Sequence, residues 1–594
     1  MKRIALALVL AASVGVPGFA AEPDGPAELI TKTEAVRIAI QDELGAQSMR
    51  DVAEQIALAE YYSVPDRRLL WVDDSGITPR GKAIMAEVAK ADDYGLRAAD
   101  YRLPNITNFN AASPDAVEQL ADAELKISMA VVEYARDARG GRINPQSLTK
   151  NLDPKLYLPQ PAEVISFIAI RSDPAGYLRS FQPTHPQFEA LRKALIAERG
   201  GQVEESSSPK DIVIPAGPLL KLGMEHGQVA MLRKRLDVPL KPGANEYVYD
   251  PELVEAVRQF QKAQGGHPDG IVGSGTRAML NGQSAAQVSG KDKINLLLAN
   301  MERWRWLPQD LGAFYVNVNI PEFKLRVVGD DAVVWETRVV VGKTNKQTPV
   351  FNDEMEEIVF RPNWYVPTSI KSEEIAPYLY RGGGFFGGGY DTSILKRQGL
   401  RIRGSNGRDI DPDTIDWSRS DIRRYEVYQP PGERNVLGLV KFRFPNTHDV
   451  YLHDTTQKHL FANAVRANSH GCMRVQNPDQ FATVLLGHDQ GWDASRVRSA
   501  MYGGIDSNKI LLKQHVPVYL TYFTAQIDDD GKLVQYKDLY GHDRRMIAAL
   551  SGGAMPSGLP GSEEVAETTQ RPVVRQRRGG NGDFEAITRA LFDF

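Results

Sequence analysis

Cysteine is almost absent from this chain: Cys472 is the single one among 594 residues. One cysteine cannot form an internal disulfide, and a structural zinc site normally needs four Cys and His ligands at short spacings. Beyond the N-terminus the sequence also lacks any apolar run long enough to cross a membrane. The net charge of −4 gives no basic excess, so no nucleic-acid partner is expected.

The N-terminus resembles an export signal. Lys2 and Arg3 form a positive end, residues 4–16 are apolar, and Gly18-Phe19-Ala20 supplies small residues, Gly18 and Ala20, at the cleavage positions. An uncleaved membrane anchor is the alternative, although the run is short for a bilayer span. Export places the thiol in an oxidising compartment, where an unpaired cysteine indicates a reactive role.

Cys472 ends the motif SHGC at residues 469–472, and His453 lies 19 positions upstream (472 − 453). A free thiol has a pKa of roughly 8.5 and is a weak nucleophile until it loses its proton. An imidazole can take that proton and form a thiolate–imidazolium pair. Gly471 lets the backbone approach a substrate, and the amides of Gly471 and Cys472 are candidates for an oxyanion hole. Cysteine with histidine therefore predicts acyl transfer through a thioester.

Each of these residues also has a structural interpretation. A lone cysteine is often a small buried apolar side chain. His453, His459 and His470 could together supply the three protein ligands of a catalytic zinc site. His470 alone is also compatible with a purely structural role.

The spacing from His453 to the SHGC motif resembles the signature of the YkuD-type L,D-transpeptidases, which remodel bacterial peptidoglycan. Further similar segments are RPNWYVP at 361–367, QPPG at 429–432, NVLGLVKF at 435–442 and FPN at 444–446. The resemblance spans about residues 310–525 and is closest to the large, multidomain Gram-negative subgroup, which implies the periplasm. Met473 and Arg474 depart from many relatives, which carry a hydrophobic residue and Asn there, but Arg is frequent in that subgroup.

The resemblance implies peptidoglycan stem peptides as substrate and gives the catalytic residues their roles. Cys472 attacks the third residue of a tetrapeptide stem, the terminal D-alanine leaves, and the amine of a second stem resolves the thioester into a 3→3 cross-link. His453 is the general base, oriented by a backbone carbonyl, and His470 is the second choice. Gly471 belongs to the oxyanion hole. No cofactor or metal is expected.

Four more residues are expected to bind substrate. Arg474 is a candidate partner for a stem carboxylate, with a structural salt bridge as the alternative. Tyr451 shares a strand face with His453, and Trp364 and Ser469 complete the set. A thiolate nucleophile of this type is expected to be acylated by carbapenem-type inhibitors.

Two other functions use the same features. If water instead of an amine resolves the thioester, the enzyme is an L,D-carboxypeptidase or a hydrolase that cuts lipoprotein from the wall. A non-catalytic wall-binding scaffold needs only the helical regions.

The chain divides into several regions, and the predicted class is multidomain α+β. Residues 31–212 read as a helical scaffold domain, a candidate docking surface for wall-synthesis proteins, because apolar residues recur at helical spacing, clearest from Val117 to Val132. Residues 219–285 resemble the three-helix peptidoglycan-binding domain.

The catalytic domain is expected at 295–527. Period-two alternation at residues 316–320 predicts a strand, and the family fold is a β-sandwich. An insert at 370–425 resembles the lid of the family, with a surface loop as the alternative; its RGGGFFGGGY run lacks the ending of a phosphate loop. Residues 528–594 are expected to be a partly disordered tail.

Overall fold

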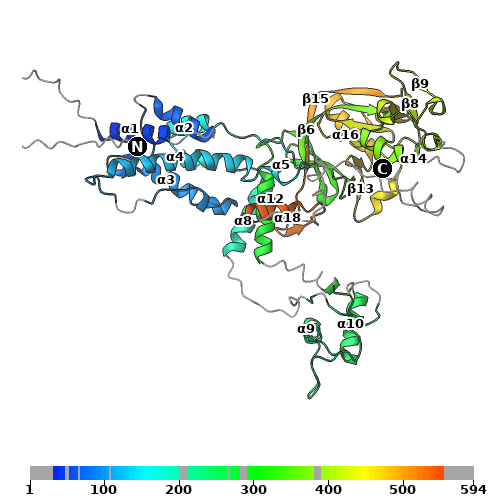
Figure 1. The fold of residues 1–594 in the computed structure, drawn as a ribbon, viewed down its shortest axis with the longest axis horizontal. Helices are drawn as coiled ribbons and strands as arrows, with labels where there is room; N and C mark the ends of the chain where they lie inside the picture. The colour runs from blue at the N-terminus through cyan, green and yellow to red at the C-terminus, as the bar shows by residue number, and fades with distance from the viewer. Residues whose placement is uncertain are drawn as a thin grey trace, which may run out of the picture.

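The computed structural model describes residues 31–46, 53–64, 67–105, 109–200, 217–263, 268–273, 276–277, 279–280, 290–379 and 390–553, with Ile212, Ile214 and Pro215. Within them the chain forms a helical N-terminal domain, a small helical unit and a β-rich domain (Figure 1), so the predicted α+β class is confirmed. The expected export signal lies outside the described residues. None of the described helices is both long and apolar enough to cross a membrane.

The N-terminal domain is a helical bundle built around its longest helix, α4. Its helices are α1 (Lys32–Ala46), α2 (Ala53–Ser63), α3 (Pro79–Val88), α4 (Ala116–Gly140), α6 (Pro161–Ile170) and α7 (Pro174–Arg179), and a short hairpin joins β1 (Val72–Asp73) to β2 (Gly76–Ile77). The predicted apolar stripe of α4 packs in the bundle core. Glu124 is also buried, because its carboxylate accepts backbone N–H groups from residues 70–72 and the hydroxyl of Tyr62.

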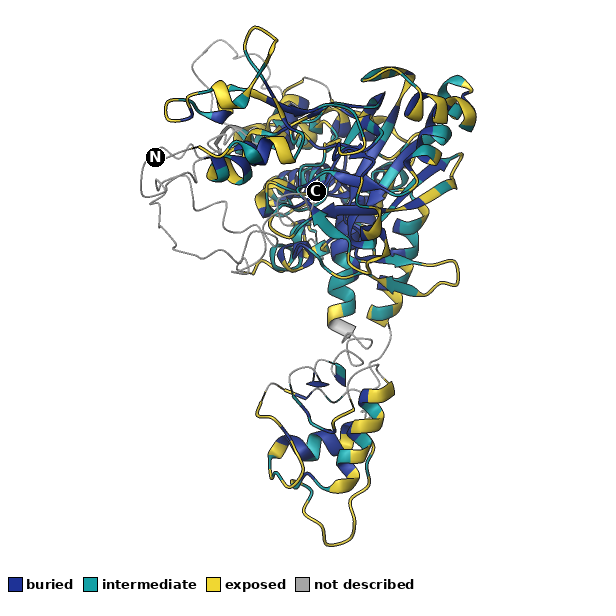
Figure 2. Ribbon diagram, turned by 90° about the vertical axis from the view of Figure 1, so that its right-hand side faces the viewer, coloured by how far each residue is buried: buried dark blue, intermediate teal, exposed yellow. Residues whose placement is uncertain are grey.

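The small helical unit contains α9 (Gly227–Arg235) and α10 (Pro251–Ala263). Apolar side chains of the two helices supply its core, in which Val229, Leu232, Leu253 and Val257 are fully buried. The unit lies apart from the other domains in Figures 1 and 2.

The β-rich domain is one nine-stranded sheet that closes on itself. Its order is β13-β5-β14-β12-β11-β6-β15-β3-β4, and an additional pairing between the last strand, β4, and β5 closes the sheet. The strands are β3 (Phe314–Asn319), β4 (Lys324–Gly329), β5 (Ala332–Gly342), β6 (Phe351–Phe360), β11 (Val440–Arg443), β12 (Leu452–His453), β13 (Ala467–Ser469), β14 (Met473–Val475) and β15 (Asn508–Thr521). The layers expected of a sandwich thus come from one continuous sheet around a buried core (Figure 2).

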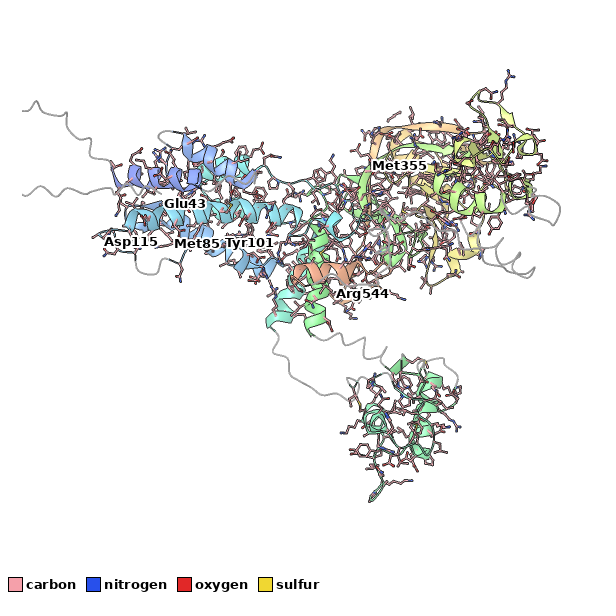
Figure 3. All side chains as sticks on the ribbon, in the orientation of Figure 1. Glu43, Met85, Tyr101, Asp115, Met355 and Arg544 are labelled. Carbon is pink, nitrogen blue, oxygen red and sulfur yellow. The ribbon has the colours of Figure 1, made fainter. Side chains whose placement is uncertain are left out.

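Helices cover this sheet and join it to the N-terminal domain. They are α5 (Pro145–Leu148), α8 (Pro186–Gly200), α12 (Gly290–Trp304), α16 (Pro478–Gln490), α17 (Ala494–Tyr502) and α18 (His542–Leu550). Met355, labelled in Figure 3, lies on β6 in the sheet core, whereas the labelled Met85 and Tyr101 lie in the helical bundle.

The expected tail begins with folded structure. Strand β16 (Ala525–Ile527) pairs with β17 (Leu533–Gln535), and α18 follows. Tyr540 and Met546 are fully buried in the core of the sheet domain. Apolar side chains in this part of the tail, up to residue 553, therefore complete the core of the sheet domain. Residues 554–594 lie outside the described residues.

The insert folds as a separate lid with its own core, and we define the lid as residues 364–429. A four-stranded sheet has the order β7-β10-β8-β9. Its elements are β7 (Trp364–Tyr365), α13 (Thr368–Ile370), the π-helical turn η5 (Lys371–Ile375), α14 (Ala376–Leu379), α15 (Ser393–Arg397), β8 (Arg401–Arg403), β9 (Asp409–Ile410) and β10 (Glu426–Gln429). Tyr451 belongs to this core and Cys472 packs against it, so the described part is not a loose surface loop. Most of the glycine-rich run, residues 380–389, lies outside the described residues.

Candidate active site

Cys472 lies in a tight loop between β13 and β14. The Ser469 hydroxyl accepts the N–H of Gly471 at 3.2 Å and donates to the carbonyl of Cys472. Gly471 has a φ of +119°, a conformation that only glycine adopts readily. A Cβ there would meet nothing closer than 3.6 Å, so backbone conformation and not crowding requires the glycine. Because Ser469 already holds the Gly471 amide, only the Cys472 amide of the predicted oxyanion pair remains.

His453 is held through its own strand end. Its Nδ1 is hydrogen-bonded to the backbone carbonyl of Asp454, so Nδ1 carries the proton and Nε2 has a free lone pair. The carboxylate of Asp454 is occupied elsewhere, accepting the backbone N–H groups of Leu439 and Thr455 at 2.9 and 2.7 Å. Nε2 of His453 is thus in the form a general base needs, with a carbonyl and not a carboxylate as its orienting partner.

One cavity of about 230 Å³ brings the predicted residues together. It is lined by Trp364, Tyr451, His453, Ser469, His470, Cys472 and Arg474, with further residues of the lid and the neighbouring loops. His459 does not line it and is exposed on the 3-10 helix η8 (Lys458–Ala462). Within the part of the chain that the structure describes, no three His, Cys, Asp or Glu residues are grouped to hold a metal. The three-histidine site is therefore not assembled.

The thiol and the imidazole are both neutral near pH 7. Burial raises the pKa of Cys472 to about 11, although the backbone N–H of Tyr451, the charge of Lys441 and the Tyr451 hydroxyl act in the opposite direction. Burial and then the charge of Arg474 lower the pKa of His453 to about 3. The expected thiolate–imidazolium pair is thus not the resting state, because an enclosed site disfavours both charged forms.

Tyr451 connects the lid to the sulfur. Trp364, Tyr451 and Cys472 all line the cavity, and the Tyr451 hydroxyl lowers the pKa of the Cys472 thiol. The Tyr451 ring lies 5.8 Å from the His453 ring, centroid to centroid, which agrees with the expected shared face. These contacts place a hydroxyl donor at the sulfur, where it favours the thiolate over the thiol.

Lys441 is a cation that the sequence reading missed. It lies on β11 opposite His453 of β12, and its Nζ is 3.6 Å from the centroid of the Tyr451 ring. Burial lowers its pKa, whereas negative charge on Cys472, when the thiolate forms, raises it. The sequence did contain a sign of this role, because Lys441 lies within the apolar segment NVLGLVKF. Strands that face a core seldom carry a charge.

Arg474 is fully buried on β14, and its Nη1 donates to Oε1 of Gln457 at 2.6 Å. This partner is an amide, not the acidic side chain expected of a structural salt bridge. The guanidinium still lines the cavity and lies next to His453 in the parallel β12–β14 pairing. It acts on the imidazole as well as facing the substrate space.

His470 contacts the lid. Its Nε2 lies 2.7 Å from Oε1 of Glu374, which belongs to the π-helical turn η5. The adjacent Glu373 pairs with Lys346 at 2.8 Å. Single π-helical turns are often found at functional sites. No sequence signal pointed to either glutamate, because only the folding of the lid over the nucleophile loop brings them there.

Comparisons with known proteins agree with this architecture. Residues 313–491 match the family "L,D-transpeptidase catalytic domain" (YkuD), residues 226–280 match "Putative peptidoglycan binding domain", and residues 56–195 match "Scaffold domain". The chain is 32% identical over 254 residues, 43% of its length, to a curated protein of Haemophilus influenzae named "Putative L,D-transpeptidase". It spans about half of that relative (49%).

Two solved structures are also similar. One is an L,D-transpeptidase from Xylanimonas cellulosilytica, at 15% identity and a TM-score of 0.13, covering 52% of this chain and 99% of the other. The second is a fused Zn-dependent amidase/peptidase/peptidoglycan-binding domain-containing protein from Clostridium acetobutylicum, at 11% identity and a TM-score of 0.14, covering 52% and 100%. TM-scores this low establish no shared fold.

The chain thus combines a region similar to the L,D-transpeptidase catalytic domain with one similar to a peptidoglycan binding domain. Its catalytic domain belongs to the YkuD family of L,D-transpeptidases, and a peptidoglycan-binding domain accompanies it.

Proposed function

We propose that the protein is a periplasmic L,D-transpeptidase that forms 3→3 cross-links between peptidoglycan stem peptides through a cysteine thioester. The observation that supports this most is that Cys472 and His453 line one cavity inside the domain that matches the transpeptidase family. An apolar run followed by small residues at 18 and 20 supports export.

In the first step the thiol sulfur attacks the carbonyl carbon of the third stem residue. Nε2 of His453 takes the thiol proton as the S–C bond forms, while the Tyr451 hydroxyl and the charge of Lys441 stabilise negative charge on sulfur. The amide of Cys472 donates to the developing oxyanion. The bond to the terminal D-alanine breaks, and its amine leaves with the proton from His453.

In the second step the side-chain amine of another stem attacks the thioester. His453 takes a proton from that amine, an amide bond forms between the two third residues, and Cys472 leaves as a thiol. The energy of the first peptide bond is conserved in the thioester, so no cofactor is required. Water in place of the amine would give a trimmed stem.

Binding is assigned to the remaining residues and domains. The buried guanidinium of Arg474 pairs with a stem carboxylate, for which its planar fork of donors is suited. The peptidoglycan-binding unit raises the local concentration of stems by tethering the enzyme to the polymer. The scaffold domain is the surface for other wall-synthesis proteins.

Mass spectrometry of muropeptides after incubation with the purified full chain tests the proposal. A cross-linked dimer that disappears in Cys472→Ala supports transpeptidation. Trimmed monomers alone would instead identify a carboxypeptidase or lipoprotein-cleaving hydrolase, and no product at all would favour a non-catalytic scaffold. Incubation with a carbapenem should increase the intact mass by one drug molecule in the parent protein and not in Cys472→Ala.

A further inference from the structure

The N-terminal domain supplies a strand segment to the catalytic domain. We call residues 149–155, between α5 and α6, the strap. Leu152 of the strap bridges Val350 in parallel, and the two backbone hydrogen bonds, from Asp153 to Val350 and from Val350 to Asn151, are both 2.8 Å. Leu152 is fully buried in the core of the sheet domain. Figure 1 shows α5, which precedes the strap, at the boundary between bundle and sheet.

Side chains of the strap reach two different loops of the catalytic domain. Nδ2 of Asn151 donates to Oε1 of Gln347 at 3.3 Å. Oδ2 of Asp153 lies 3.0 Å from Nε2 of His448. One loop precedes β6 and the other precedes β12. Residues in or directly after each loop contact the nucleophile loop.

The first loop fixes the peptide before the cysteine. Thr348 is fully buried, and its Oγ1 donates to the carbonyl of Gly471 at 2.7 Å while accepting the N–H of Gly342 at 2.9 Å. In a trans peptide the N–H points opposite to the C=O. Holding the Gly471 carbonyl therefore sets the direction of the Cys472 N–H, the remaining donor of the oxyanion hole.

The second loop leads to the residue that touches the sulfur. His448, Asp449 and Val450 line the cavity. Tyr451 follows immediately, and its backbone N–H and its hydroxyl both lower the pKa of the Cys472 thiol. The hydrogen bond between Asp153 and His448 thus anchors the stretch that leads to Tyr451.

We propose that the strap is a positioning element of the active site, with Asn151 and Asp153 acting through Thr348 and Tyr451 on the Gly471–Cys472 peptide. This inference rests on the acyl transfer proposed above and gives the scaffold domain a role in it. A displacement of about 1 Å at a reacting group costs on the order of 10²-fold in rate. A motion or partner that lifts the strap would therefore slow the reaction without touching the cavity.

The test is the double variant Asn151→Ala/Asp153→Ala in the full chain. Acylation by a carbapenem should slow about 10-fold, because the amide that receives the oxyanion is less well oriented. Amide hydrogen exchange in residues 469–473 should become faster by a similar factor. Asp122→Ala/Lys126→Ala removes an exposed 2.8 Å ion pair on α4 and is the matched control, expected to leave both rates within about twofold.

Two further variants separate positioning from folding. Asp153→Asn keeps an acceptor for His448 and should restore most of the rate. If the strap acts through Thr348, the effects of Asn151→Ala and Thr348→Val on acylation should combine less than additively. Fully additive effects would show that the strap does not act through Thr348.

Hydrogen exchange also decides the matter independently of the proposed chemistry. Unchanged exchange at 469–473 in the double variant would overturn the strap inference even if acylation is slowed. If no carbapenem acylates the parent protein, the proposed function is contradicted. Faster exchange in the double variant would still support the strap inference in that case. If the double variant unfolds, Asn151→Ala replaces it: exchange at residues 469–473 should again be faster than in the parent, and protection equal to that of the parent would overturn the strap inference.

Discussion

His453 and Arg474 are direct neighbours on the parallel strands β12 and β14, and both side chains are buried. Burial is the main cause of the lowered pKa of His453, about 3, and the adjacent guanidinium adds to it. A buried cation beside the imidazole disfavours the imidazolium form and so keeps His453 unprotonated. The resting site is therefore a neutral thiol facing a neutral base, and charge develops only as the sulfur attacks.

The first prediction concerns pH. Carbapenem acylation should be nearly constant between about pH 5 and 8, because His453 protonates only near 3 and Cys472 ionises only near 11. The measurement is the rate of adduct formation, followed by intact mass in buffers of constant ionic strength. A rate that rises about tenfold with each pH unit would instead show that a pre-formed thiolate is the attacking species.

The second prediction separates the two histidines. His453→Ala should slow acylation by about 10²- to 10⁴-fold, because the imidazole that accepts the thiol proton is lost. His470→Ala should have a much smaller effect, since its Nε2 faces Glu374 of the lid. Rates of both variants are compared at one pH and one drug concentration. The reverse order would move the general base to His470.

The strands, helices and nucleophile loop followed from local patterns in the sequence. Val316 and Val318 are buried on β3 as the period-two alternation predicted. His453 and Cys472 share a cavity, as the motif spacing suggested. These features were predictable because side-chain periodicity and motif spacing are properties of the chain itself.

Features that depend on distant contacts were not predictable. Asn319 was expected on the solvent face but is buried, because its side-chain amide exchanges two hydrogen bonds with the backbone of Phe523. Tyr540 lies in the segment that reads as a tail, yet its hydroxyl donates to the Gly342 carbonyl at 2.7 Å. In both cases the partner is about 200 residues away in sequence, so no local pattern records it.

The third prediction concerns Lys441. Lys441→Met keeps an apolar stem over the Tyr451 ring but removes the charge that lowers the pKa of Cys472. The pKa of the thiol should therefore rise, and alkylation by iodoacetamide at about pH 9 should slow several-fold, because only the thiolate reacts. Lys441→Arg retains the charge and is the control. Equal alkylation rates for the methionine and arginine variants would show that the lysine does not act on the sulfur.

The fourth prediction concerns the contact between lid and nucleophile loop. Glu374→Gln keeps the shape of the side chain but removes the charge facing His470 at 2.7 Å. If this contact helps to hold the lid over the cavity, the variant should show a KM for stem peptide raised several-fold, with kcat changed less, because closure contributes to binding.

Glu373→Gln, which weakens the neighbouring pair with Lys346, should act in the same direction, and the two changes should not be additive since both residues lie on η5. Lys396→Ala breaks the exposed pair with Asp413 elsewhere on the lid and is the control, with kinetics expected to match the parent. An unchanged KM in both glutamate variants would mean that the lid is held by its apolar core against Tyr451 alone.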